Sequence, residues 1–291
     1  MVLEPEKHYE AADEFLRQAG IRRAVPDEET LEAILRPFSR FPYENISKIL
    51  KLNRWFLEPQ RIRTPEEVVE DHIRFRLGGT CFSLTFTLQT ILERVGFTCY
   101  PVMAHMRSGL NCHCALVVRL EGRKVLVDPG YLLHRPLVLD KDRRRLYHTA
   151  FAGVELRFDP ADEHYHLYTF NRLESKWRYR FEDRPTPPVE FLQHWLDSFY
   201  RPTMHGICLS VATQDGLLYL HNDYFRLTTF DRKETRRVRQ DLPRFVQQVF
   251  GIPAELVEEA ERALEENLRL ERVHGIYRPR EPEWNRSQLN L

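Results

Sequence analysis

The stretch Leu77-Gly78-Gly79-Thr80-Cys81-Phe82 places a cysteine shortly after a pair of glycines. After it, apolar residues recur at a helical spacing until Gly96 provides a stop: Leu84, Leu88, Ile91, Leu92 and Val95. The spacing predicts a buried helix with Cys81 in its first turn. Unpaired N–H groups and the positive end of the helix dipole favour a thiolate there, so Cys81 is a candidate nucleophile. The alternative is an inert, buried cysteine.

A nucleophilic thiol needs a base, and His113 offers one at the start of the strand-like run 112–120. A two-residue turn, Glu121-Gly122, would join this run to the run 124–128 as a tight hairpin. In that register His113 and Asp128 share a face as diagonal neighbours, roughly 7–8 Å apart before their side chains reach toward each other. We expect the other face to be the core face and Asp128 to stay out of the core. The core face comprises Leu116, Val118, Leu120, Val125 and Val127. The hairpin therefore offers a carboxylate that could orient an imidazole.

With these residues located, the sequence resembles the arylamine N-acetyltransferase family. Cys81, His113 and Asp128 occur in that family's order and approximate spacing. The segments that resemble family motifs cover most of the chain: Pro42-Tyr43-Glu44-Asn45-Ile46-Ser47, Gly78-Gly79-Thr80-Cys81, Val127-Asp128-Pro129-Gly130-Tyr131 and the region 198–216. The resemblance implies a two-step transfer from acetyl-CoA to the nitrogen of an arylamine or hydrazine, through an acyl thioester on Cys81.

The resemblance also implies a site and a fold. Its substrate-binding residues would be Tyr43, Thr80, Gly130 and Tyr131, with acetyl-CoA as co-substrate, a small-molecule amine as acceptor and no metal. The implied fold is α+β, with an N-terminal helical bundle, a central β-barrel or sheet, a C-terminal α/β lid and a cysteine-protease-like core. We expect three units: 1–97 with the nucleophile, 98–188 with the histidine and aspartate, and 189–291 as the lid.

The sequence departs from the family pattern around the nucleophile. Leu77 replaces the family's arginine, Ser83 and Thr85 stand where Glu and Asn usually follow, Cys112 replaces a threonine, and Pro129 follows the aspartate. We expect the changes at 77, 83 and 85 to remove polar support from Cys81. They leave open an amide synthase that takes its acyl group from a carrier protein, a thiol hydrolase, or a binding protein without activity.

Other residues have competing interpretations. His105 is a rival base, but no adjacent hairpin strand delivers an aspartate to it. Cys112-His113-Cys114 suggests zinc, yet consecutive strand residues point to opposite faces and no partner motif follows. His164 and His166 are expected to form a surface pair. The basic runs 143–145 and 232–239 could hold the phosphates of CoA, although a solvated face is the commoner role.

Composition is typical of a soluble enzyme. The 291 residues are 42% hydrophobic, and 43 Lys plus Arg balance 43 Asp plus Glu, which gives no general attraction to nucleic acid or to a membrane. No secretory leader or membrane-spanning run is recognised, and five cysteines argue for reduced thiols, so we expect a cytoplasmic protein.

Local patterns predict the remaining elements. Helices are predicted at 9–19, 27–36, 189–198 and 253–268, and a capping box at Thr64-Pro65-Glu66-Glu67 opens another helix toward Arg76. Strands are predicted at 99–106, 112–120, 124–128 and 165–170, with Asp215-Gly216 as the hairpin turn between 207–213 and 217–220.

Overall fold

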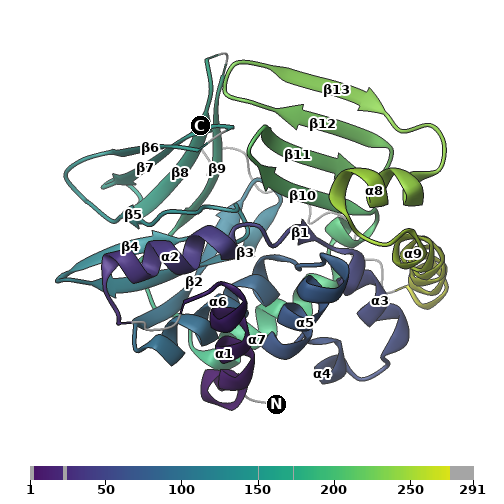
Figure 1. Ribbon diagram of the computed structural model, residues 1–291, viewed down its shortest axis with the longest axis horizontal. Helices are drawn as coiled ribbons and strands as arrows, with labels where there is room; N and C mark the ends of the chain where they lie inside the picture. The colour runs from purple at the N-terminus through teal and green to yellow at the C-terminus, as the bar shows by residue number, and fades with distance from the viewer. Residues whose placement is uncertain (1–2, 22–24, 150, 173, 276–291) are drawn as a thin grey trace.

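A computed structural model describes residues 3–21, 25–149, 151–172 and 174–275 of the protein. Figure 1 shows three groups of elements: helices around α6 below, a curved eight-stranded sheet at the upper left, and a second sheet with α8 and α9 at the right. The expected α+β fold with a barrel-like sheet is confirmed. None of the helices in these ranges combines the length and apolar character that a bilayer crossing requires.

The helical part surrounds α6 (Cys81–Val95), which ends at Gly96 in the left-handed conformation (φ 101°). The helices before it are η1 (Pro5–His8), α1 (Tyr9–Gln18), α2 (Glu28–Phe38), α3 (Ile46–Arg54), α4 (Glu58–Arg61) and α5 (Pro65–Phe75). The predicted capping box at Thr64 is present: its hydroxyl accepts from the Glu67 amide, and the Glu67 carboxylate accepts from the Thr64 amide.

The eight-stranded sheet has the order β5-β4-β3-β2-β9-β8-β7-β6, and all its pairings are antiparallel. Its strands are β2 (Thr98–Met106), β3 (Gly109–Leu120), β4 (Arg123–Val127), β5 (Leu137–Val138), β6 (Arg145–His148), β7 (Gly153–Asp159), β8 (His164–Phe170) and β9 (Ser175–Phe181). The outermost strands, β5 and β6, come into contact, so the sheet curls into a nearly closed barrel.

The second sheet has the order β1-β10-β11-β12-β13 and joins distant parts of the chain, because β1 (Tyr43–Glu44) pairs with β10 (Cys208–Thr213). Its other strands are β11 (Gly216–His221), β12 (Tyr224–Thr228) and β13 (Lys233–Arg237), and the remaining helices are α7 (Pro188–Asp197), η2 (Ser198–Tyr200), η3 (Pro202–Met204), α8 (Leu242–Phe250) and α9 (Ala254–His274). Helix α9 packs against α3.

The hairpin formed by β3 and β4 has the predicted register. Glu121 and Gly122 both have positive φ (48° and 78°), as a type I′ turn requires, and Leu120 pairs with Arg123. The prediction that only one face of this hairpin is buried is wrong. Its second face lines the barrel interior, and Asp128 is fully buried there, because the sheet curls over that face.

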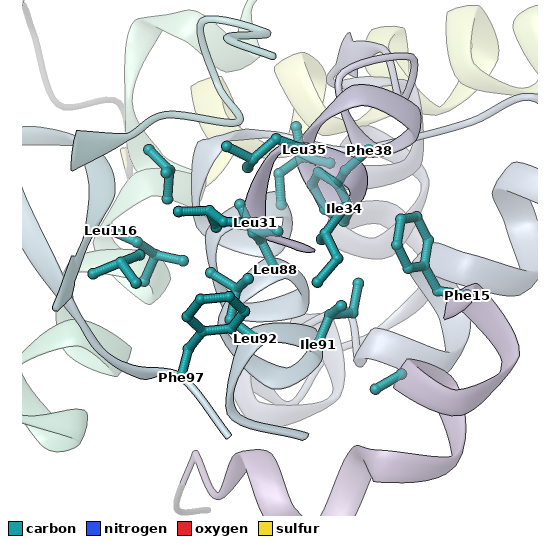
Figure 2. Packing of buried hydrophobic residues seen from close by; sticks show 14 of the residues in the cluster. Phe15, Leu31, Ile34, Leu35, Phe38, Leu88, Ile91, Leu92, Phe97 and Leu116 are labelled. Carbon is teal, nitrogen blue, oxygen red and sulfur yellow. The ribbon is translucent and has the colours of Figure 1, made fainter. Parts of the chain in front are cut away.

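The main hydrophobic core lies between the helices and the outer face of the barrel. Figure 2 shows α2 and α6 meeting there, with Phe15 of α1 at one end and Leu116 of β3 at the other. The side chains of α2 and α6 in this view are Leu31, Ile34, Leu35, Phe38, Leu88, Ile91 and Leu92. This packing fixes α6 against β3, so the first turn of α6 lies beside the hairpin.

Several sequence predictions differ from the structure. Helices α3, α4 and α8 and strands β1, β5, β6, β7, β9, β12 and β13 were not predicted, because their patterns are short or interrupted by polar residues. The β10–β11 turn lies one residue earlier than predicted, at 214–215, since Thr213 pairs with Gly216. Division into units at 97 and 188 stays a prediction, and residues 276–291 of the third unit lie outside the described ranges.

Candidate active site

The glycine pair before Cys81 lets two chain segments pack closely. A Cβ on Gly78 would lie 2.1 Å from the Pro42 carbonyl oxygen, and one on Gly79 would lie 2.1 Å from the Ser83 hydroxyl oxygen. The Gly79 amide donates to that Pro42 carbonyl (3.2 Å), and the Gly79 carbonyl accepts from the amide of Glu44 (2.9 Å). The two segments that resemble family motifs at 42–47 and 78–81 therefore lie side by side at the start of α6.

Cys81, His113 and Asp128 come together in the structure as predicted. Cys81 is the first residue of α6 and lies next to His113, since a Cβ added at Gly130 would be 2.8 Å from Cε1 of His113 and 3.1 Å from Cβ of Cys81. The Nε2 of His113 lies 2.8 Å from Oδ2 of Asp128, and all three side chains are buried. The Cys81 sulfur also lies 4.0 Å from the carbonyl oxygen of Cys112. An imidazole thus stands between a thiol and a carboxylate.

Two tyrosines complete the surroundings of Asp128. The Tyr179 hydroxyl donates to Oδ2 (2.6 Å), and the Tyr131 amide donates to Oδ1 (3.0 Å). Both rings pack on the imidazole of His113, with centroids 4.8 Å away for Tyr179 and 5.2 Å for Tyr131. Tyr179 was not identified from the sequence, because β9 was not predicted and only the pairing of β9 with β2 brings it to this site.

The charges of the site favour a thiolate and an imidazolium. The neighbouring Cys114 thiol lowers the pKa of Cys81, burial opposes this, and His113 and Lys48 lower it further, which leaves it well below its usual value. Burial would lower the pKa of His113, but the neighbouring Asp128 and Cys81 outweigh burial and raise it to about 10. A thiol that ionises this readily is suited to nucleophilic attack near neutral pH.

The four predicted substrate-binding residues all lie around Cys81. Thr80 is the N-cap of α6, although its side chain makes no capping hydrogen bond, and Tyr43 forms an isolated bridge with Gly79. Gly130 lies against the triad: an added Cβ would be 2.8 Å from Cε1 of His113 and 3.1 Å from Cβ of Cys81. Burial raises the pKa of both Tyr43 and Tyr131, so both hydroxyls stay protonated.

We expected the changes at 77, 83 and 85 to remove polar support from around Cys81. The structure corrects this expectation, because Arg63, which was not identified from the sequence, lies there. Arg63 is buried beneath the glycine pair and donates to the carbonyl of Gly78 and to the hydroxyl of Ser47 (3.0 Å). It also pairs with Asp71 (2.5 Å) and lies 3.6 Å from the fully buried Glu44. Arg63 therefore brings a positive charge to the segment 77–81, where this sequence has Leu77 in place of an arginine.

The other polar departures also have partners. The Ser83 hydroxyl donates to the Thr80 carbonyl (3.1 Å), and the Thr85 hydroxyl donates to the Cys114 carbonyl (3.4 Å). The Cys112 thiol donates to the Gly109 carbonyl (3.1 Å). The Ser83 contact closes the first turn of α6, the Thr85 contact ties α6 to β3, and the Cys112 contact lies within β3.

The rival base and the histidine pair lie outside this site. His105 accepts from the Asn111 amide (3.2 Å), and burial lowers its pKa to about 4. The expectation that His164 and His166 form a surface pair is wrong for His166, which is buried. Trp177 donates to its Nδ1 (3.1 Å), and Asp162 lies 3.0 Å from its Nε2.

The structure also shows the surroundings of the possible metal ligands and of the basic runs. Within the described ranges, the one group of three possible ligands is Asp159, Asp162 and His166, where Asp162 already pairs with Arg180 (2.8 Å). In the basic runs, several arginines have acidic partners: Arg145 pairs with Asp140, Arg232 with Glu234 and Arg237 with Asp223. A role for these runs in binding CoA stays a prediction.

Comparison with known proteins gives the same fold. The structure of the arylamine N-acetyltransferase from Mycobacterium abscessus matches with a TM-score of 0.74 and 19% identity, over 90% of this chain and 97% of that one. The enzyme from Salmonella typhimurium matches with a TM-score of 0.70 and 19% identity, over 87% and 98%. The Bacillus cereus enzyme, described as having a unique Cys-His-Glu catalytic triad, matches with a TM-score of 0.66 and 20% identity, over 84% and 98%.

Sequence comparison identifies the family. No protein with a curated description matches this sequence. The family model described as N-acetyltransferase matches residues 27–259, which includes the three predicted catalytic residues and most of the chain. The expected acyltransferase class is confirmed at this level, and the chain belongs to the N-acetyltransferase family.

Proposed function

We propose that this protein transfers the acetyl group of acetyl-CoA to the nitrogen of an arylamine or hydrazine, with Cys81 as nucleophile, His113 as acid and base, and Asp128 as the residue that orients His113. The observation that carries the proposal is the position of His113, which lies next to Cys81 and 2.8 Å from Oδ2 of Asp128. Family membership supports the acetyl group as the one transferred.

The first half-reaction uses the thiolate. The Cys81 sulfur attacks the carbonyl carbon of the acyl thioester, the bond from that carbon to the CoA sulfur breaks, and His113 gives its proton to the departing thiolate of CoA. An acetyl thioester on Cys81 and a neutral imidazole remain. Asp128 keeps the imidazole in its working orientation, because its carboxylate stays hydrogen-bonded to Nε2.

The second half-reaction releases the product. The acceptor nitrogen attacks the thioester carbonyl, His113 takes the proton that the nitrogen loses, and the bond to the Cys81 sulfur breaks, which restores the thiolate and the imidazolium. Tyr43, Thr80, Gly130 and Tyr131 would line the space for acyl group and acceptor. The absence of a side chain at Gly130 supports this, since a Cβ there would contact both reacting side chains.

The test measures release of free CoA from acetyl-CoA with and without a panel of arylamines and hydrazines. The proposal predicts release that depends on the acceptor, parallel lines in double-reciprocal plots, and no activity in Cys81→Ser, since the serine hydroxyl has a much higher pKa than the thiol. Release at the same rate without acceptor would indicate a hydrolase. A complete lack of release by folded protein would favour a carrier-bound acyl donor.

A further inference from the structure

Lys48 is a buried lysine in the part of the molecule that holds Cys81. It lies on α3 and is 6% exposed. Its Nζ donates to the hydroxyl of Ser198 (2.5 Å) and lies 4.6 Å from the ring centroid of Phe199. Phe199 and Cys81 belong to one contiguous cluster of buried side chains, so the ammonium lies at the edge of the apolar surroundings of the thiol.

The charge of Lys48 lacks an acidic partner. Among the ion pairs of the described residues, none joins Lys48 to a carboxylate, whereas Lys51, one turn further along α3, pairs with Glu67 (2.5 Å). A buried ammonium held by one hydroxyl and one aromatic ring is costly unless a negative charge is near. A negatively charged group near the ammonium must therefore offset this cost.

The thiolate of Cys81 is the anion that the surroundings offer. Cys81⁻, His113⁺ and Asp128⁻ together carry one net negative charge, and this charge is enclosed in the protein interior. One protonated lysine brings the buried group to neutrality. Each charge also favours the other, since Lys48 lowers the pKa of Cys81 and Cys81 opposes the loss of the Lys48 proton.

We propose that Lys48 is a positioning residue whose ammonium acts as a second counter-ion to the Cys81 thiolate, in addition to His113. This inference rests on the proposed function only for the assignment of Cys81 as nucleophile. When Cys81 becomes a neutral thioester, Lys48 loses its counter-ion and its proton is held less firmly, so its charge follows the state of the nucleophile.

Other charged and titratable groups act on the pair from β3 and from the segment after η2. Cys114 on β3 faces both side chains, His113 on β3 faces Cys81, and Arg201 after η2 opposes the charge of Lys48. Burial first, and Arg201 in addition, lower the pKa of Lys48 to about 7, against the opposing effect of Cys81. Support from Lys48 should therefore weaken as the pH rises through neutrality, and His113⁺ then remains the principal cation.

The test is the pH dependence of Cys81 alkylation by iodoacetamide, followed at the Cys81 peptide by mass spectrometry. In Lys48→Met the thiol pKa should rise by about one unit, which slows alkylation about tenfold at pH values below the wild-type pKa. Lys48→Arg should keep the thiol pKa low because the charge is retained. Lys51→Met, the same substitution one turn away, should leave it unchanged.

A pKa of Cys81 that is the same in wild type and folded Lys48→Met would overturn the proposal. If Lys48→Met does not fold, as judged by near-ultraviolet circular dichroism, Lys48→Gln serves instead, since it removes the charge and can still donate to Ser198. Alkylation needs neither acetyl-CoA nor an acceptor. A protein that shows the pKa shift but never becomes acetylated would refute the proposed function and leave the role of Lys48 intact.

Discussion

Replacing Gly130 by alanine should disable the triad without removing any of its members. The new Cβ would lie 2.8 Å from Cε1 of His113, whereas ordinary contacts begin at 3.4 Å, so the ring must move by about 0.6 Å. It would also lie 3.1 Å from Cβ of Cys81 and 3.3 Å from Oδ1 of Asp128, so the imidazole cannot move without disturbing its hydrogen bonds.

The expected cost follows from that displacement. Misplacement of a catalytic group by 1 Å costs up to about 100-fold in rate, so a shift of this size should lower the acetyl-transfer rate by about 10- to 100-fold. Overpacking should lower the free energy of unfolding by about 1–3 kcal/mol. The rate is measured as acceptor-dependent release of CoA, and the stability by urea unfolding.

Gly122→Ala provides the matched control. A Cβ there meets nothing within 4 Å, and its penalty comes only from the positive φ of 78° in the hairpin turn. It should therefore lose about 1 kcal/mol of stability and keep the wild-type rate. If folded Gly130→Ala transfers acetyl groups as fast as Gly122→Ala, the idea that the backbone at residue 130 sets the position of the triad is wrong.

The remaining predictions concern charge. Asp128→Asn should lower the transfer rate by up to about 10⁴-fold, measured by CoA release, because the carboxylate that fixes His113 is lost. The pH profile of transfer should rise as the pH passes the lowered pKa of Cys81 and fall as the pH passes about 10, where His113 loses its proton. Arg63→Met should lower the free energy of unfolding by about 3–5 kcal/mol, measured with urea, since Glu44 is left buried beside no cation.

A specific result would contradict each of these three predictions. Arg94→Met removes an exposed pair with Asp13 (2.8 Å) and should cost less than about 1 kcal/mol, so equal losses for both arginines would refute the account of Arg63. Transfer by Asp128→Asn at more than a tenth of the wild-type rate would show that orientation of His113 does not limit the reaction. A profile that is flat below pH 9 and rises above it would mean that Cys81 starts as a neutral thiol.

The catalytic candidates could be predicted from local sequence because local rules place them. Helical spacing and Gly96 located Cys81 in the first turn of α6, and the two-residue turn fixed the register that puts His113 beside Asp128. These features depend on residues that are neighbours in the chain. They hold irrespective of the rest of the fold.

The features of the site that were not predicted from the sequence depend on packing between distant parts of the chain. Tyr179 reaches Asp128 only because β9 pairs with β2, and Lys48 reaches the site only because α3 packs near η2. The burial of Asp128 follows from closure of the barrel, and alternation along one hairpin cannot reveal that closure. Arg63 stands fifteen residues before Gly78, so no local pattern connects the two.

In the proposed mechanism, Cys81 carries the acyl group between the two half-reactions. The most direct measurement is intact-mass spectrometry of the protein after incubation with acetyl-CoA alone, followed by peptide mapping. We expect a mass gain of one acetyl group, located on Cys81 and lost when an arylamine or hydrazine is added. An unchanged mass while Cys81 can still be alkylated by iodoacetamide would contradict it.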